Sequence, residues 1–143
     1  MNQVMQGQPM TIFGDGLQTR AFSHVDDVAP VIARAPFVNA SYQQVCNVGA
    51  DRPYTVLDLA HEVAAAFGVD PQIRHLPARN EVTHAFSTHA KVRALFGDGP
   101  QIDLKTGIRR MAAWAKARGP MAPVNFKNIE IERNLPVSWR PQK

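Results

Sequence analysis

The stretch "TIFGDGLQTRAFSHVDD", Thr11–Asp27, contains two glycines separated by one residue, an arginine shortly after them, and a pair of aspartates. A dinucleotide-binding fingerprint needs G-x-G-x-x-G at the start of a helix, so that the pyrophosphate lies on the helix N-terminus. Here Thr19 stands in place of the third glycine, and the residues from Arg20 onward alternate as in a strand. We therefore interpret the stretch as a hairpin-like loop with a turn at Asp15-Gly16 that carries Arg20.

Length and composition are typical of one soluble globular domain, with 143 residues of which 45% are hydrophobic. The single cysteine, Cys46, excludes a disulfide framework and is interpreted as a small buried apolar residue. The sequence has no apolar run long enough to span a membrane and no secretory leader. These observations predict a cytoplasmic protein with no membrane partner.

The charge balance is mildly basic, with 16 Lys and Arg against 12 Asp and Glu and a net charge of +4. Most of these cations are arginines, whose guanidinium forks match phosphate oxygens in pairs. An anionic ligand is one interpretation, and an ordinary solvated surface is the other. Nucleic-acid binding is not expected, because the basic residues are scattered and form no run.

The periodicity predicts short helices that alternate with short strands, and therefore a small mixed α/β lobe that packs against something larger. The clearest helix starts at a capping box of Thr55 and Asp58 and ends at Gly68. A second helix, 104–118, is capped by Asp103. Further predicted elements are a helix end at Met1–Gly7 whose beginning lies elsewhere, a helix 26–35 capped by Asp26, a buried strand Val45–Val48, a strand Ile73–Leu76, a short helix capped by Thr88 and ending at Gly97, and a strand at "NIEIE", 128–132.

Three arginines, Arg20, Arg52 and Arg79, are predicted to lie in loops rather than on helix faces. An isolated arginine is more often a surface ion-pair partner than a ligand-binding group. Arg20 and Arg79 are each flanked by apolar segments that would hold the loop rigid, so these two are the better candidates for a diphosphate clamp.

Other chemistry is not supported by the spacing of the residues. His75, His84 and His89 lack helical metal-ligand spacing, so no metal is expected. Asp26 and Asp27 are explained by helix capping and the helix dipole. We single out no catalytic residue, since no Ser/His/Asp or Cys/His group stands out. A Tyr-x-x-x-Lys pair is also missing: the two tyrosines are followed four positions later by Cys46 and Asp58.

Four motifs in order resemble one family. "GQPMTIFGDGLQTRAFSHVDDVAPVIARA" is similar to G-x-P-x-x-I-x-G-x-G-x-Q-x-R-D-F-x-x-V-x-D of extended short-chain dehydrogenases/reductases, the NAD-dependent nucleotide-sugar epimerases and dehydratases. "NVGADRPYTVLDLAHEVAAAFG" resembles their N-x-G turn and capped helix, and "LPARNEVTHAFSTHAKVRALFG" resembles their P-x-R…(E/D)-V loop and the helix after it. The ending "DLKTGIRRMAAWAK…IEIERNLPVSW" looks like the tail of a bacterial subgroup.

The resemblance implies the C-terminal substrate domain of such an enzyme, similar to UDP-glucose 4-epimerase, without the Rossmann domain that supplies NAD and the Tyr-x-x-x-Lys pair. Residues 1–120 would form the nucleotide-sugar-binding lobe, and residues 121–143 would form a tail packed on or near it. The expected ligand is a nucleotide-diphosphate sugar, a UDP-sugar above all. The implied binding residues are Arg20 and Arg79 at the diphosphate, Thr11 to Phe13 in the nucleotide pocket, Phe22 after the arginine, and Glu81 at the ribose hydroxyls.

Some residues depart from the family pattern: Ala21 replaces the usual Asp, "RNEV" is tighter than R-x-G-E-V, and "FGDGPQIDL" stands where LGW-x-P is frequent. We accordingly expect a truncated chain that needs no cofactor of its own and is catalytically silent alone, whereas NAD is implied for a full-length isomerase or lyase. Its partner would be the missing Rossmann domain or a second copy. The alternative hypothesis is a stand-alone module, derived from such an enzyme, that self-associates through the face the Rossmann domain would cover.

Overall fold

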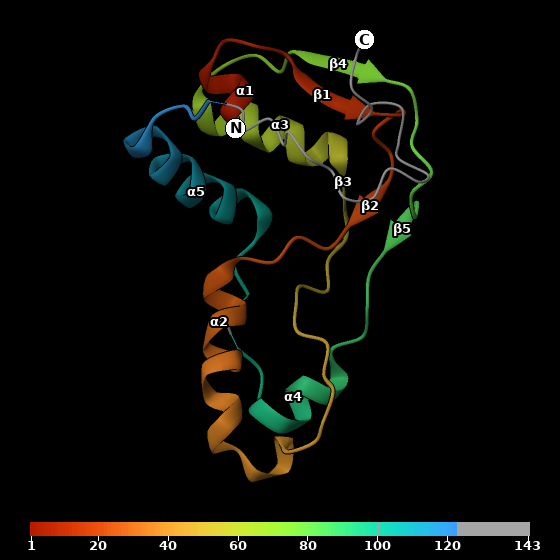
Figure 1. Ribbon diagram of the computed structural model, residues 1–143, viewed down its shortest axis with the longest axis vertical. Coiled ribbons are helices and arrows are strands. Elements are labelled where there is room, and N and C mark those ends of the chain that lie inside the picture. Colours follow the sequence, from red (N-terminus) through yellow and green to blue (C-terminus); the bar gives the residue numbers. More distant parts are fainter. Residues whose placement is uncertain (100, 123–143) are drawn as a thin grey trace, which may run out of the picture.

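Short strands in two small sheets and five α-helices make up the described part of the molecule, residues 1–99 and 101–122 of this computed structural model (Figure 1). The fold is mixed α/β, as predicted. The elements in chain order are α1 (Asn2–Met5), β1 (Met10–Phe13), β2 (Thr19–Arg20), α2 (Val25–Arg34), the 3-10 helices η1 (Ala35–Phe37) and η2 (Asn39–Ser41), β3 (Tyr54–Thr55), α3 (Val56–Phe67), β4 (Ile73–Leu76), β5 (His84–Ala85), α4 (Ala90–Phe96) and α5 (Leu104–Arg118).

The stretch Thr11–Asp27 contributes strands to two different sheets. β1 pairs in parallel with β4, whereas β2 lies between β3 and β5 in the second sheet. The predicted hairpin is therefore wrong, because β1 and β2 do not pair with each other. The predicted turn is present, and its glycines take φ values of +69° at Gly14 and +79° at Gly16. The left-handed turn changes the direction of the chain, so β2 joins a different sheet from β1.

The capping box of α3 is confirmed in both directions. The Thr55 hydroxyl accepts a hydrogen bond from the Asp58 N–H at 2.9 Å, and the Asp58 carboxylate accepts one from the Thr55 N–H at 2.8 Å. These bonds lower the pKa of Asp58 below its ordinary value. At the other end, Gly68 adopts the left-handed conformation with φ of +71°. Local sequence signals thus set both ends of this helix.

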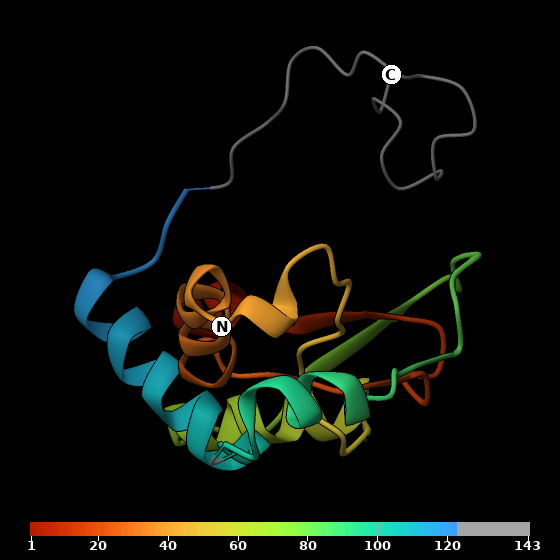
Figure 2. The same cartoon turned by 90° about the horizontal axis from the view of Figure 1, so that it is seen from below.

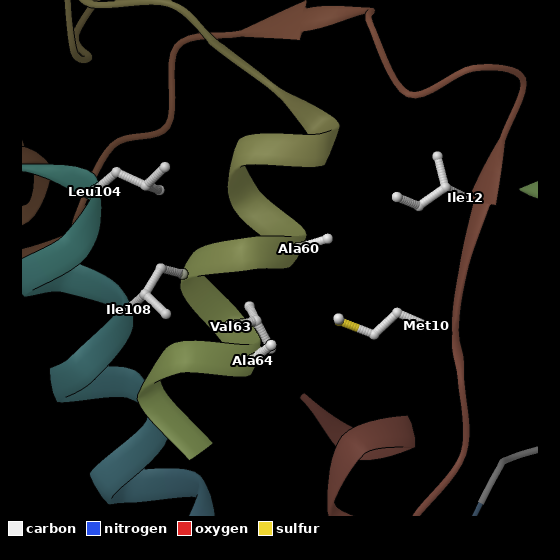
Figure 3. Close-up of a cluster of buried hydrophobic side chains, with 7 residues drawn as sticks. All are labelled: Met10, Ile12, Ala60, Val63, Ala64, Leu104 and Ile108. Carbon is white, nitrogen blue, oxygen red and sulfur yellow. The ribbon is translucent and has the colours of Figure 1, made fainter. Parts of the chain in front are cut away.

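The hydrophobic core lies between β1, α3 and α5, with α3 in the middle (Figure 3). β1 buries alternate residues, since side chains of a strand point to opposite faces. The small side chains of Ala60 and Ala64 allow β1 to approach α3 closely, and Ala64 is completely buried. The clustered residues are Met10, Ile12, Ala60, Val63, Ala64, Leu104 and Ile108. This packing fixes β1, the strand that leads into the candidate site.

α2 and α4 lie at the opposite end of the long axis from β1 and β4 (Figure 1), and Figure 2 views the molecule from that end. The helix caps here differ from the predictions. His24, rather than Asp26, caps α2 by accepting a hydrogen bond from the Asp26 N–H at 3.1 Å. His89, rather than Thr88, stands at the N-cap of α4. Asp26 is instead the second residue of α2, in its first turn, and its carboxylate pairs with Arg110 of α5 at 3.2 Å.

The predicted strand Val45–Val48 is also wrong, because this segment is irregular and the side chain of Val45 is 86% exposed. Cys46 nearby is half-buried and free. An apolar run becomes a strand only where a neighbouring strand pairs with its backbone, and the described structure places none beside it. The predicted strand 128–132, and most of the predicted tail 121–143, lie outside the described residues.

None of the helices among the described residues is long and apolar enough to cross a membrane.

Candidate functional site

The site begins on the face of β1 that turns away from the core. Met10 and Ile12 are buried against α3, so Thr11 and Phe13 lie on the opposite face and are half-buried. Thr11 is held from α1, since the Gln3 side chain accepts from the Thr11 N–H and donates to its hydroxyl, both at 3.2 Å. Phe13, at the end of the strand, faces the loop after β4.

Phe13 is the platform for Arg79. The guanidinium carbon of Arg79 lies 3.2 Å from the centroid of the Phe13 ring, in a cation–π contact. The Phe13 carbonyl accepts a hydrogen bond from the Gln18 side chain at 3.0 Å, which ties the strand end to the loop before β2. Arg79 is exposed, so its charge is available to solvent while the ring restricts its position.

Arg20 is held on β2 by two kinds of partner. One guanidinium nitrogen donates to the carbonyls of Thr19 at 2.8 Å and Thr83 at 3.3 Å, and the other pairs with the Glu81 carboxylate at 3.2 Å. Glu81 also lies 3.4 Å from the Gln18 amide, and its N–H donates to the Arg79 carbonyl at 3.0 Å. Gln18 therefore connects the Phe13 and Glu81 ends of one contact network, which sequence reasoning did not single out.

We call these five residues, Phe13, Gln18, Arg20, Arg79 and Glu81, the arginine cluster. The structure brings together four of the residues predicted from the sequence. Arg20 lies on β2 rather than in the predicted loop, because Thr19 and Arg20 pair with β3 and β5, and Arg79 lies in the loop after β4 as predicted. The guanidinium groups and the carboxylate suit a ligand that combines phosphates and hydroxyls, whereas the Phe13 ring supports Arg79. Among the described residues, no group of three or more His, Cys, Asp or Glu side chains gathers in a way that could hold a metal ion.

Phe22 lies elsewhere, because it packs against the hydrophobic core rather than against the arginine cluster. It lines an open, mainly apolar groove of about 720 Å³ between the start of α2 and α5, opposite Met111 and Trp114. Trp114 is 62% exposed. A role of Phe22 at the ligand stays a prediction from resemblance, and its observed contacts are structural.

A Ser–His–Asp alignment that the sequence did not reveal joins the loop before β3 to α4. The buried ring of His89 lies 2.6 Å from the Asp51 carboxylate through one nitrogen and 3.1 Å from the Ser87 hydroxyl through the other. Asp51 also pairs with Arg93 at 2.7 Å, so its charge is shared between two partners. Since this ion pair weakens the support that Asp51 could give to His89 as a base, we interpret the group as a clasp that holds α4 in place.

The clasp predicts a loss of stability in acid. The hydrogen bond from His89, followed by contacts with Arg93, keeps the pKa of Asp51 below its ordinary value of 3.8. A carboxyl group with a depressed folded pKa contributes its full stabilisation above the unfolded pKa, and this contribution decreases as the pH falls through the folded pKa. Asp51→Asn should therefore destabilise the protein at pH 6 more than at pH 3.

Urea titrations at the two pH values measure this difference. Asp70→Asn, which removes an exposed carboxylate elsewhere, is the matched control and should show no such pH dependence. An equal loss in Asp51→Asn at both pH values would show that the clasp does not depend on the ionised carboxylate.

The remaining histidines make separate local contacts. His75 lies 2.7 Å from the carbonyl of Gly14, and His84 lies 2.9 Å from the Thr19 hydroxyl. Both contacts fasten neighbouring strands and the turn beside the arginine cluster. They explain these histidines as structural groups around the site.

Solved structures with the same fold indicate the class of protein to which this fold belongs. The chain superimposes on a UDP-glucuronic acid 4-epimerase from Bacillus cereus, solved in complex with UDP-glucuronic acid and NAD, with a TM-score of 0.75 and 24% identity over 82% of this chain and 38% of that one. The fold is thus that of part of an NAD-dependent epimerase. No family model matches the sequence.

The similarity also extends to the amino-acid sequences of curated relatives. A putative UDP-glucose 4-epimerase of Methanocaldococcus jannaschii is 31% identical over 118 residues, and UDP-glucuronic acid decarboxylase 1 of Danio rerio is 28% identical over 109 residues. These matches cover 81% and 76% of this chain, but only 37% and 26% of the relatives. The chain is homologous to a part of the NAD-dependent nucleotide-sugar epimerases and dehydratases, the extended short-chain dehydrogenases/reductases, which confirms the resemblance.

Proposed function

We propose that this chain is the part of an NAD-dependent epimerase or dehydratase that binds the nucleotide-diphosphate sugar, with a UDP-sugar as its ligand. The observation that carries the proposal is the arginine cluster. The Arg20 guanidinium, on β2, pairs with the Glu81 carboxylate, and the Arg79 guanidinium, in the loop after β4, stacks on the Phe13 ring; Gln18 links the two contacts. Guanidinium forks suit diphosphate oxygens, and a carboxylate suits the hydroxyls of ribose. The names of the two relatives described above support a UDP-sugar, whereas other relatives are GDP-mannose 3,5-epimerases.

Redox chemistry is not assigned to these 143 residues. The Gly-x-Gly turn leads into β2 rather than into a helix N-terminus, so the residues present do not fit a dinucleotide pyrophosphate. Neither tyrosine is followed by lysine at the spacing of the catalytic pair. In this proposal the chain binds and orients the sugar nucleotide, and the purified chain has no epimerase or dehydratase activity of its own.

Isothermal titration of the purified chain with UDP, UDP-glucose and NAD tests this division of roles. We expect UDP and UDP-glucose to bind and NAD not to bind, with no conversion of UDP-glucose or UDP-galactose on prolonged incubation. Binding of NAD or measurable turnover would contradict the proposal.

A second candidate function, a self-associating module, is favoured by one observation. Several large apolar side chains are more than 70% exposed, namely Phe37, Tyr42, Val45 and Phe86. Exposed apolar groups of this size often mark a surface that another protein covers. Light scattering on the titration samples separates the two: a concentration-dependent dimer that takes up no UDP would support the module, and a monomer that binds UDP would support the substrate lobe.

A further inference from the structure

Arg20 already holds an anion in this structure, and that anion belongs to the protein. Its guanidinium donates to the carbonyls of Thr19 and Thr83 through one nitrogen, and the second nitrogen faces the Glu81 carboxylate at 3.2 Å. The Arg20 side chain is 28% exposed and the Glu81 side chain 41% exposed, so solvent reaches this pair. The carboxylate thus occupies the position at Arg20 where a phosphate oxygen would bind.

Glu81 is held in this position by its neighbours. Its N–H donates to the Arg79 carbonyl at 3.0 Å, and its second carboxylate oxygen lies 3.4 Å from the amide nitrogen of Gln18. Arg79 and Glu81 thus belong to one loop, and the Glu81 carboxylate pairs with Arg20 on β2. Because the pair is exposed to solvent, a ligand that displaces the side chain from Arg20 must offset the free energy of a surface ion pair.

Ligands of different chemistry would meet Glu81 differently. Inorganic pyrophosphate must displace the carboxylate from Arg20 and then remains beside an unpaired negative charge, which costs free energy. A nucleoside diphosphate also displaces it, but its ribose hydroxyls can donate to the carboxylate in its new position. The displaced charge then has partners, so the penalty is smaller.

We propose that Glu81 is a specificity-determining residue of this site: it competes internally for Arg20, so that diphosphates without hydroxyl groups are rejected in favour of nucleoside diphosphates. This inference rests on the proposed function and adds selectivity to it. A negative charge alone is not enough for tight binding, because the ligand must also donate hydrogen bonds to the carboxylate that it displaces.

The test compares inorganic pyrophosphate with UDP on the wild-type chain and on Glu81→Gln, by isothermal titration at constant ionic strength. The isosteric amide removes the competing charge, and we expect pyrophosphate to bind about two- to fivefold more tightly, the range of a solvent-exposed ion pair. UDP should bind Glu81→Gln no more tightly than it binds the wild type, so the ratio of UDP affinity to pyrophosphate affinity should decrease. Glu62→Gln, which removes a carboxylate from α3, controls for the change in net charge. Glu81→Ser serves as a second variant, and thermal melts verify that each variant folds.

The outcomes separate the inference from the function on which it rests. If UDP binds the wild type but pyrophosphate affinity is unchanged in both Glu81 variants, or rises equally in Glu62→Gln, the selectivity inference is overturned and the proposed function stands. If the wild type binds no UDP, both are overturned. A gain for pyrophosphate confined to the Glu81 variants supports the inference.

Discussion

Replacing Gly16 with alanine should lower the free energy of unfolding by about 2–4 kcal/mol. This is the largest stability effect that we expect, although the substitution removes no contact. Gly16 is buried in the turn between β1 and β2 with φ of +79°, a conformation that side chains disfavour. A Cβ atom added there would lie 2.7 Å from Cγ of Leu57 and 3.2 Å from a methyl group of Ile12. Backbone strain and crowding therefore act together.

Gly68→Ala is the matched control for this prediction. Gly68 has a similar φ of +71°, but an added Cβ atom would meet nothing within 4 Å. It should cost only the conformational penalty, about 1 kcal/mol. Urea titration of both variants gives the comparison, and equal losses would show that the contact with Leu57 does not constrain the turn. The turn also places Gln18, so the Gly16 variant should weaken UDP binding while the Gly68 variant should not.

Arg79→Ala and Arg20→Ala should each weaken UDP binding by about tenfold or more, because hydrogen bonds to charged groups contribute about 1.5–3 kcal/mol. Arg79 is placed by its stacking on Phe13, and Arg20 by its bonds to the carbonyls of Thr19 and Thr83. The lysine variants should recover only part of the affinity, since a point charge cannot donate as a planar fork or stack equally well. Isothermal titration with UDP measures each loss.

The control is Arg109→Ala, which removes an exposed arginine from α5. It should leave UDP affinity nearly unchanged, because it lies outside the arginine cluster. A loss as large as that of Arg79→Ala would mean that general positive charge attracts the nucleotide. Unchanged affinity in both cluster variants would exclude the cluster as the diphosphate site.

Sequence patterns predicted the elements that local chemistry specifies. α3 has its capping box and terminal glycine, and α5 begins at its predicted cap, Asp103. The strand β4 was predicted with the bounds that it has. β4 pairs with the distant β1, but the hydrogen bonds that cap the two helices join residues only a few positions apart. Such signals can be read without knowledge of distant residues.

Predictions failed where the partner is distant in sequence. The chain between β1 and β2 looked like a hairpin because its turn signal is local, whereas the pairing strands β4, β3 and β5 come much later. Val45–Val48 looked like a strand because of its apolar residues alone. Asp26 looked like a cap, but its carboxylate pairs with Arg110. Pattern analysis cannot supply these partners, since distance along the chain does not limit contact in space.

The candidate site shows the same division. The residue types and turn signals of the sequence by themselves singled out Arg20 and Arg79, because apolar flanks and glycine turns are local properties, although Arg20 lies on β2 and not in a loop. Only the tertiary structure decided that Arg79 stacks on Phe13 and that Glu81 faces Arg20, and it packed Phe22 against the core, away from these contacts. The physical reason is that a side chain's neighbours depend on how β1, β2 and the loop after β4 pack, and this packing is a property of the whole lobe.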